Sequence, residues 1–408
     1  MLRQGAFLAA MIVLIGAAVA GAAPATLVCD QEPGARLYWV ERGFCDLEMN
    51  GPEHAQGIII WNHGINATTE QWRAPTPPAF RLLQARGWDV LILKRNHLGD
   101  ANVDVALSRT VERTLEEARI QHERGYRRVV LAGQSFGGYV TLEAASRSGD
   151  IFAAIAMAPG VRPIGANARL DTSVTERLLR RIKTERVAVV FPKDDALFGN
   201  VIRGESANNI LAARRLAYLL LDETSGLTGH AGGIGGRFAL MYGLCLSEFL
   251  AAPALPAGRF TCPPAEEWDA ARELLVPSGS TVSVVDDPTS VGTGLAAFTG
   301  RWYGVLEDTI VFFGLLEGGG ASSPPRSLYR WAAFRIGGGI FDVAVKDGQL
   351  GVGFPNGASI VVSPVGGEMV LTWTSADGTR VVNTVLAREK RLPTRSASTG
   401  ARTSNPLR

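Results

Sequence analysis

The chain has 408 residues, 46% of them hydrophobic, which is enough for two domains with buried cores. Lys and Arg number 41 against 39 Asp and Glu, and a net charge of +2 provides no electrostatic footprint for nucleic acid. No Cys-x-x-Cys pair and no His-Glu-x-x-His motif occurs, so we expect no metal site and no cofactor.

The first 22 residues have the pattern of a secretory signal peptide. Arg3 provides the positive start, residues 6–20 are apolar, and small residues around Ala22 offer a cleavage site. The apolar stretch is short for a membrane span of about 20 residues, so we expect no stable span after cleavage. The sequence therefore predicts a secreted or periplasmic protein.

Four cysteines follow this segment, and an even number of cysteines in an exported protein favours disulfides. Three pairings are possible. We predict Cys29–Cys45 and Cys245–Cys262, because each pair closes a short loop near an edge of the domain that contains it.

Residues 23–265 alternate between short apolar strands and helical segments, which indicates a doubly wound, mostly parallel α/β sheet. Continuous apolar strands suit a sheet that is covered on both faces. Any lid must be small, and we expect it within Gly160–Arg177. The predicted strands are 37–40, 58–61, 88–93, 129–132, 152–157, 186–191 and 216–221, and the predicted helices are 79–86, 103–124, 136–147, 173–183, 206–214 and 237–250.

The most informative motif is Gly-Gln-Ser-Phe-Gly, which starts at Gly133 between an apolar strand and a helical stretch. This context is typical of a nucleophile elbow. The backbone of the serine is strained in such a turn, and its neighbours two positions away must lack bulk, as Gly133 and Gly137 do. Ser135 is the predicted nucleophile; the alternative is an ordinary glycine-rich turn with a bystander serine.

A serine hydroxyl needs a base to take its proton. In proteins with this elbow, the chain order is serine, acid, histidine. Only His230 among the five histidines follows Ser135, and it lies on a loop after an apolar strand. His230 is therefore the predicted base, and a surface loop histidine is the alternative interpretation.

The acid must hold the imidazole and stabilise its cation, and it should follow a strand between the serine and the histidine. Asp194 and Asp195 occupy such a position. We predict Asp195, because apolar residues 196–198 can anchor the chain after it. Asp194 is the alternative, and Asp222 and Glu223 are weaker candidates.

Two backbone N–H groups are predicted to form an oxyanion hole. One belongs to Phe136, directly after the nucleophile, and the other to the loop after strand 57–61. A His-Gly pair, His63 and Gly64, is an expected feature of that loop. We assign the second donor to Ile65, with Gly64 as the alternative, and expect His63 to shape the loop.

These motifs, in this order, resemble the α/β-hydrolase superfamily over roughly residues 36–250. The resemblance implies an eight-stranded, mostly parallel sheet with flanking helices, and a serine hydrolase that works through an acyl-enzyme intermediate. The fold does not select a substrate, and we expect a small ester because it is the least demanding one. A peptidase, a thioesterase and a non-catalytic hydrolase-like binding protein remain alternatives.

We expect a small-molecule ligand and no nucleic-acid partner, and the sequence does not predict the oligomeric state. Trp72, Phe136 and Phe198 are candidates for the wall of an apolar pocket, although large aromatic residues near an active site often only pack.

The remaining chain has three parts. Residues 266–295 have the composition of a linker. Residues 296–388 contain short alternating strands with glycine turns, typical of a small antiparallel sandwich or barrel. Its start, residues 300–304, resembles β-modules attached to some bacterial hydrolases, and ligand binding, active-site cover, assembly and plain packing are its possible roles. Residues 389–408 form a basic tail that is predicted to be disordered.

Overall fold

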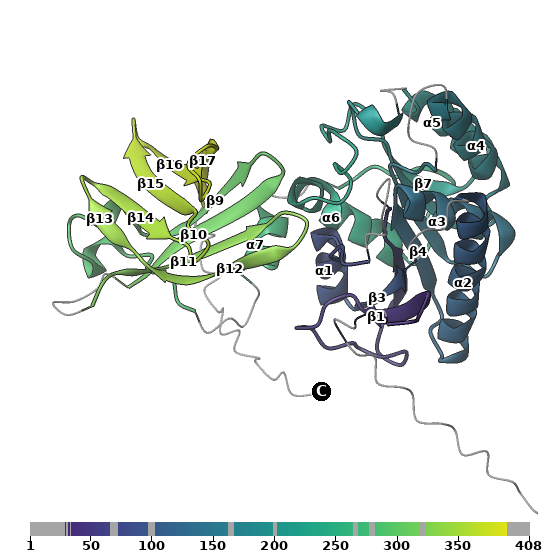
Figure 1. Ribbon diagram of the computed structural model, residues 1–408, viewed down its shortest axis with the longest axis horizontal. Helices are drawn as coiled ribbons and strands as arrows, with labels where there is room; N and C mark the ends of the chain where they lie inside the picture. The colour runs from purple at the N-terminus through teal and green to yellow at the C-terminus, as the bar shows by residue number, and fades with distance from the viewer. Residues whose placement is uncertain are drawn as a thin grey trace, which may run out of the picture.

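The fold is described from a computed structural model of the full chain, which shows two domains side by side (Figure 1). The described residues are 29, 32, 34–65, 72–96, 103–161, 167–198, 202–263, 268–276, 282–317 and 323–389. The predicted signal peptide lies outside this part of the chain, as does the predicted tail beyond residue 389.

The first domain is built on an eight-stranded sheet in the order β1-β3-β2-β4-β5-β6-β7-β8. Only β1 is antiparallel to its neighbour, and the other pairs are parallel. Every residue of the central strands is buried, as expected for a sheet with two covered faces. The strands are β1 (Tyr38–Arg42), β2 (Gly57–Asn62), β3 (Trp88–Arg95), β4 (Val129–Gln134), β5 (Ala153–Met157), β6 (Arg186–Val190), β7 (Ala217–Leu221) and β8 (Gly258–Arg259).

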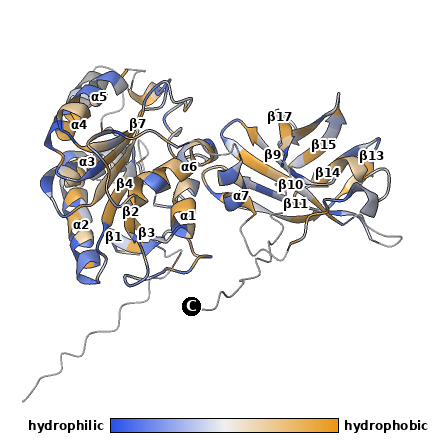
Figure 2. Ribbon diagram, turned by 180° about the vertical axis from the view of Figure 1, so that it is seen from behind, coloured by the Kyte–Doolittle hydropathy of each residue, from blue (hydrophilic) through white to orange (hydrophobic). Residues whose placement is uncertain are grey.

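Helices cover both faces of this sheet, and apolar strands lie between them (Figure 2). The first core cluster joins α1 and α6 to one face, and the second joins α2, α3, α4 and α5 to the other. The predicted alternation of strands and helices is therefore present. The helices are α1 (Pro78–Ala85), α2 (Val103–Glu123), α3 (Phe136–Arg147), α4 (Asn167–Arg181), α5 (Gly204–Ala213), α6 (Gly236–Ala251) and α7 (Asp269–Leu275).

Both cysteine pairs are joined as predicted. Cys29 and Cys45 form one disulfide, and Cys245 of α6 is bonded to Cys262 beyond β8. These bonds fit a protein that folds in an oxidising compartment. Within the described ranges, none of the helices combines the length and the apolar character needed to cross a membrane.

The second domain is a nine-stranded antiparallel sheet that curls into a nearly closed barrel. Its order is β12-β11-β10-β9-β17-β16-β15-β14-β13, and β12 comes close to β14. Alternate residues point inward to a core of their own. The strands are β9 (Arg301–Leu306), β10 (Thr309–Glu317), β11 (Arg326–Ala332), β12 (Ile336–Asp342), β13 (Ala344–Lys346), β14 (Gln349–Gly353), β15 (Ser359–Val365), β16 (Glu368–Thr374) and β17 (Val381–Arg388).

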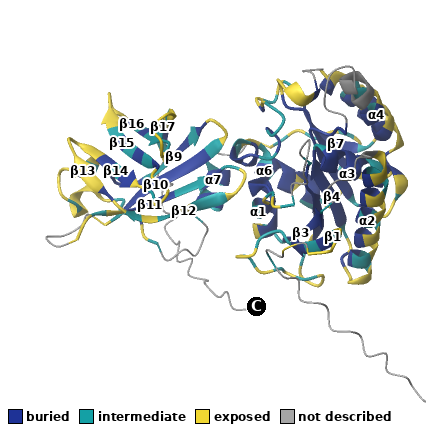
Figure 3. Ribbon diagram, viewed as in Figure 1, coloured by how far each residue is buried: buried dark blue, intermediate teal, exposed yellow. Residues whose placement is uncertain are grey.

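The two domains share a hydrophobic core. The cluster that lies under α1 and α6 continues through α7 to buried residues of β9, β10 and β11 (Figure 3). Arg86, after α1, forms an ion pair with Glu273 of α7 at 2.9 Å. The β-domain therefore covers apolar surface of the first domain, and the interface is part of the folded unit.

The closest backbone approach across the interface is at the start of α6. The Arg237 N–H donates a hydrogen bond to the carbonyl oxygen of Asp308, in the β9–β10 turn, at 3.1 Å. A Cβ atom on Gly236 would lie only 2.0 Å from the carbonyl oxygen of Ala332, at the end of β11. Glycine at this position therefore permits the docking of the β-domain.

We expect Gly236→Ala to lower the free energy of unfolding by about 1–3 kcal/mol, because the backbones must separate to accept the methyl group. Gly235→Ala is the matched control, since its Cβ would sit 3.7 Å from Asp308, an ordinary contact. Urea denaturation of the two variants and the wild type measures the difference. Equal stability of both variants would show that the domains do not dock in this way.

Candidate active site

Ser135 lies in a sharp turn between β4 and α3. Its φ of 56° and ψ of −121° belong to a strained conformation that serine rarely adopts. A Cβ on Gly133 would lie 2.1 Å from the carbonyl oxygen of Gly137, and a Cβ on Gly137 would lie 2.0 Å from that of Asn62. The two glycines thus let three backbone segments meet, and the turn has the shape of a nucleophile elbow.

His230 lies beside Asp195. Its Nδ1 atom is 3.1 Å from each carboxylate oxygen of Asp195, whose side chain is 96% buried. Asp194 is exposed and has a positive φ of 56°. The structure therefore brings His230 together with Asp195 and turns the neighbouring aspartate toward solvent.

The weaker acid candidates have other partners. The carboxylate of Asp222 accepts hydrogen bonds from the backbone and the hydroxyl of Thr224. Glu223 accepts hydrogen bonds from the N–H groups of Arg203 and Gly204, where α5 begins. Both carboxylates therefore stabilise local structure after β7.

Backbone pairing aligns the loop of Asp195 with the loop of His230. The Lys193 N–H donates to the carbonyl oxygen of Leu227 at 2.8 Å, and the Gly229 N–H donates to that of Lys193 at 2.7 Å. The backbone carbonyl of His230 also accepts a hydrogen bond from Gln134 Nε2 at 3.2 Å. Because Gln134 directly precedes Ser135, these contacts place the histidine loop next to the elbow.

Arg203 is a site residue that the sequence did not reveal. Its buried guanidinium lies 3.4 Å from Asp195, donates to the carbonyl oxygen of Pro159 at 3.0 Å, and stacks on Phe191 and Phe198. It places a positive charge beside the carboxylate that contacts the histidine. Arg203 lies outside any strand or motif in the sequence, so no local pattern indicates it.

Hydrogen bonds from Arg95 hold the loop after β2. The guanidinium of this fully buried residue donates to the carbonyl oxygens of His63 and Gly64, at 2.5 and 3.2 Å, and lies 4.9 Å over the ring of Phe136. The Arg95 N–H donates to His63 Nε2 at 3.2 Å. This network fixes the loop that ends at Ile65, the last described residue of this segment.

Burial, assisted by the charge of Arg95, lowers the pKa of His63 well below its usual value. The neutral ring can donate from Nδ1 to the carbonyl oxygen of Gly64 at 2.8 Å while Nε2 accepts from Arg95. His63 is thus a buried structural residue of the loop, in the role expected from the sequence.

The first turn of α3 packs on the end of β2, as the contact between Gly137 and Asn62 shows. The first N–H groups of a helix have no acceptor within the helix. The N–H of Phe136, the first residue of α3, is therefore free of helical bonding and lies near the loop that carries Gly64 and Ile65.

A cavity of about 620 Å³ opens at these loops. Trp72 contributes to its wall, as expected, whereas Phe136 and Phe198 are buried beneath the site. Phe334 of the β-domain also lines it, which no local sequence pattern indicates. The expected lid segment, Gly160–Arg177, includes residues 162–166, outside the described residues, and the part of α4 up to Arg177. The cavity is lined by Trp61, His63, Gly64, Ile65, Trp72, Arg73, Ala74, Pro75, Pro77, Gln134, Leu197, His230, Ala231, Ile234 and Phe334.

The order of the parallel strands and the elbow after a central strand decide the fold. The first domain has the α/β-hydrolase fold. No model of a protein family matches the sequence, and no curated protein matches it.

Several solved structures resemble part of the chain at low identity. The esterase Pf2001 of Pyrococcus furiosus is 15% identical, over 55% of this chain and 96% of its own, with a TM-score of 0.39. A monoacylglycerol lipase of Paleococcus ferrophilus is 13% identical, over 52% of this chain and 98% of its own, with a TM-score of 0.37. A puromycin-hydrolyzing peptidase of Mycobacterium tuberculosis is 14% identical, over 56% of this chain and 39% of its own, with a TM-score of 0.39.

The lowered pKa of His63 makes stability depend on pH. Below about pH 6.5 the unfolded chain binds a proton at this histidine and the folded chain does not, so the free energy of unfolding falls as the pH drops. We expect a loss of up to about 1.4 kcal/mol per pH unit from this group, which His63→Gln removes.

Urea denaturation of both proteins at pH 7.5, 6.5 and 5.5 measures this effect. The carboxylates with lowered pKa values, such as Asp46 and Asp222, change charge only at more acidic pH and do not interfere. Identical pH dependence in the two proteins would contradict a buried neutral His63.

Proposed function

We propose that the chain is a serine hydrolase that cleaves small ester-like substrates with Ser135, His230 and Asp195. The observation that carries the proposal is the contact of His230 with the buried carboxylate of Asp195. The backbone of His230 is also hydrogen-bonded to Gln134, the residue before Ser135. The strained elbow supports it, because such backbone strain is stored mainly at functional sites.

In the proposed reaction, Ser135 Oγ attacks the ester carbonyl carbon while His230 takes the hydroxyl proton. Asp195 stabilises the imidazolium that forms. The oxyanion accepts hydrogen bonds from the N–H groups of Phe136 and Ile65, with Gly64 as the alternative to Ile65. The intermediate collapses, His230 protonates the leaving alcohol, and the acyl group stays on Ser135.

Hydrolysis of the acyl-enzyme repeats these steps with water. The oxygen of the water molecule attacks the acyl carbon while His230 takes a proton from the water. His230 then returns that proton to Ser135 Oγ as the carboxylic acid product leaves. The same groups would also cleave a peptide or a thioester, so these residues do not select the leaving group.

We also propose that the protein is exported and acts outside the cytoplasm. The predicted signal peptide at residues 1–22 and the two disulfides support this location. Expression with its own leader in a bacterial host should yield a periplasmic or secreted protein that begins near residue 23. A full-length chain confined to the cytoplasm would contradict export.

Ser135→Ala and His230→Ala should each lower kcat for p-nitrophenyl acetate by about 10⁴–10⁶. Ser135→Ala should also abolish labelling by a fluorophosphonate probe, because the probe reacts with an activated serine. Circular dichroism checks that both variants remain folded. A folded wild type that neither reacts with the probe nor cleaves any ester, thioester or peptide would favour the non-catalytic alternative.

The adjacent aspartates provide a matched pair of variants. Asp195→Asn should lower kcat by about 10⁴, because the amide cannot hold the imidazole in the required tautomer or stabilise its cation. Asp194→Asn should change kcat by no more than a few fold, since this side chain points to solvent. The opposite ranking in p-nitrophenyl acetate assays would assign the acid to Asp194.

A further inference from the structure

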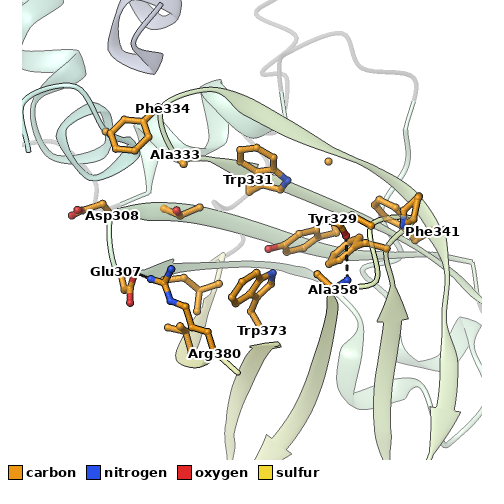
Figure 4. Close-up of a pocket in the computed structure, with 18 residues that line it drawn as sticks. Glu307, Asp308, Tyr329, Trp331, Ala333, Phe334, Phe341, Ala358, Trp373 and Arg380 are labelled. Atoms are coloured by element: carbon orange, nitrogen blue, oxygen red, sulfur yellow. Dashed lines mark hydrogen bonds and ion pairs between the residues drawn. The ribbon is translucent and has the colours of Figure 1, made fainter. Parts of the chain in front are cut away.

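The β-domain contains a second cavity of about 720 Å³, and six of the eighteen residues that line it are aromatic (Figure 4). The rings come from β11, β12, β16 and the turns between strands, so residues far apart in the sequence surround one space. The charged residues that line it include Glu307 and Arg380, which form an ion pair with each other. The aromatic residues of the wall are Tyr329, Trp331, Phe334, Phe341, Phe354 and Trp373.

The aromatic wall is organised before any ligand binds. Phe341 and Phe354 meet edge to face at 5.1 Å between ring centroids, and Tyr329 packs on Phe354 at 5.5 Å. Aromatic pairs in such arrangements stabilise one another beyond the burial of their surface. A preformed apolar cavity loses little free energy to reorganisation when it binds a ligand.

Tyr329 provides one polar group in this wall. Its side chain is only 3% exposed, its hydroxyl has no hydrogen-bond partner among the described residues, and burial raises its pKa, so it stays protonated. Figure 4 shows the hydroxyl between Trp331 and Trp373.

Phe334 joins this cavity to the candidate active site, because its ring lines both. It lies in the turn between β11 and β12, and 45% of its surface is exposed. Gly235 lines the β-domain cavity, and Ile234, its neighbour in the chain, lines the active-site cavity. The two spaces therefore border each other along the loop that carries His230.

We propose that the two cavities form one elongated substrate site, in which the β-domain cavity binds the unbranched hydrocarbon chain of a long-chain ester. This inference rests on the proposed function, since the ester group of the same molecule would lie beside Ser135. It names the substrate class as esters with a long aliphatic chain.

The composition of the wall favours a hydrocarbon chain over a sugar. A sugar that enters a cavity must replace the hydrogen bonds that its many hydroxyls make with water, or it loses binding energy. This wall exposes more apolar than polar surface, and of its charged residues Glu307 and Arg380 already pair with each other, which leaves Asp308 as its other charged group. Each methylene that leaves water for such a wall strengthens binding by up to about fourfold.

The first test measures kcat/KM for p-nitrophenyl acetate and p-nitrophenyl dodecanoate with the full-length protein. In the wild type we expect a strong preference for dodecanoate. Trp373→Ala and Phe334→Ala should each lower the dodecanoate-to-acetate ratio at least tenfold. Ile340→Ala is the control, because this exposed residue of β12 precedes Phe341 and does not line the cavity.

The second test measures binding without catalysis. Fluorescence of 11-(dansylamino)undecanoic acid should rise on addition of Ser135→Ala protein, and dodecanoate should displace the probe. Adding Trp373→Ala to this background should weaken probe binding at least tenfold, and adding Ile340→Ala should not.

The outcomes separate this inference from the proposed function. Cleavage of acetate with no preference for dodecanoate and no probe binding would overturn the inference and leave the hydrolase intact. Probe binding that depends on Trp373, without hydrolysis of any ester, would refute the hydrolase and support the chain site. Displacement of the probe by cellohexaose but not by dodecanoate would overturn the hydrocarbon assignment.

Discussion

The active site depends most on two close contacts between backbone atoms, which Gly133 and Gly137 permit. Gly133 and Gly137 let β4, α3 and the end of β2 approach until no side-chain atom fits between them. This approach forces Ser135 into a strained conformation and brings the first N–H groups of α3 beside the loop after β2. The nucleophile and both proposed oxyanion donors therefore depend on this close packing. Gly236 permits a similar backbone contact at the interface between the domains.

The proposed base depends on a different set of contacts. The loop of His230 is paired on one side with the loop of Asp195 and continues on the other into α6, where the β-domain docks. The position of the imidazole thus depends both on contacts inside the first domain and on contacts at the domain interface. In the proposed mechanism, a change at the interface would alter catalysis through this loop without touching a catalytic group.

Much of the first domain was predictable because its signals are local. Apolar runs indicate the buried strands, the glycine spacing indicates the sharp turn at Ser135, and the order of serine, acid and histidine leaves only His230 as the predicted base. The choice between Asp194 and Asp195 was weaker, because both follow the same strand and only the turn conformation separates the exposed carboxylate from the buried one. β8 was missed, since two residues are too few to show periodicity.

The residues that the sequence did not reveal are brought to the site by tertiary contacts. Arg203 contacts the carboxylate of Asp195 although no motif joins the two residues, and Phe334 lines the candidate active-site cavity only because the β-domain docks on α6. No spacing in the sequence reports such a contact. For the same reason, the strands of residues 296–388 predict a barrel or sandwich but do not predict that this domain lies beside the candidate active site.

The two domains divide the physical requirements of a hydrolase between them. Proton transfer and oxyanion binding need polar groups held within tenths of an ångström, and the buried parallel sheet with its strained elbow supplies that rigidity. Binding of an apolar chain needs area and shape more than exact direction, and the aromatic interior of a small barrel supplies those. Phe334 borders both cavities, so in the proposed substrate site the turn between β11 and β12 would link the reacting group to substrate selection, and its sequence can change without altering the backbone that holds Ser135.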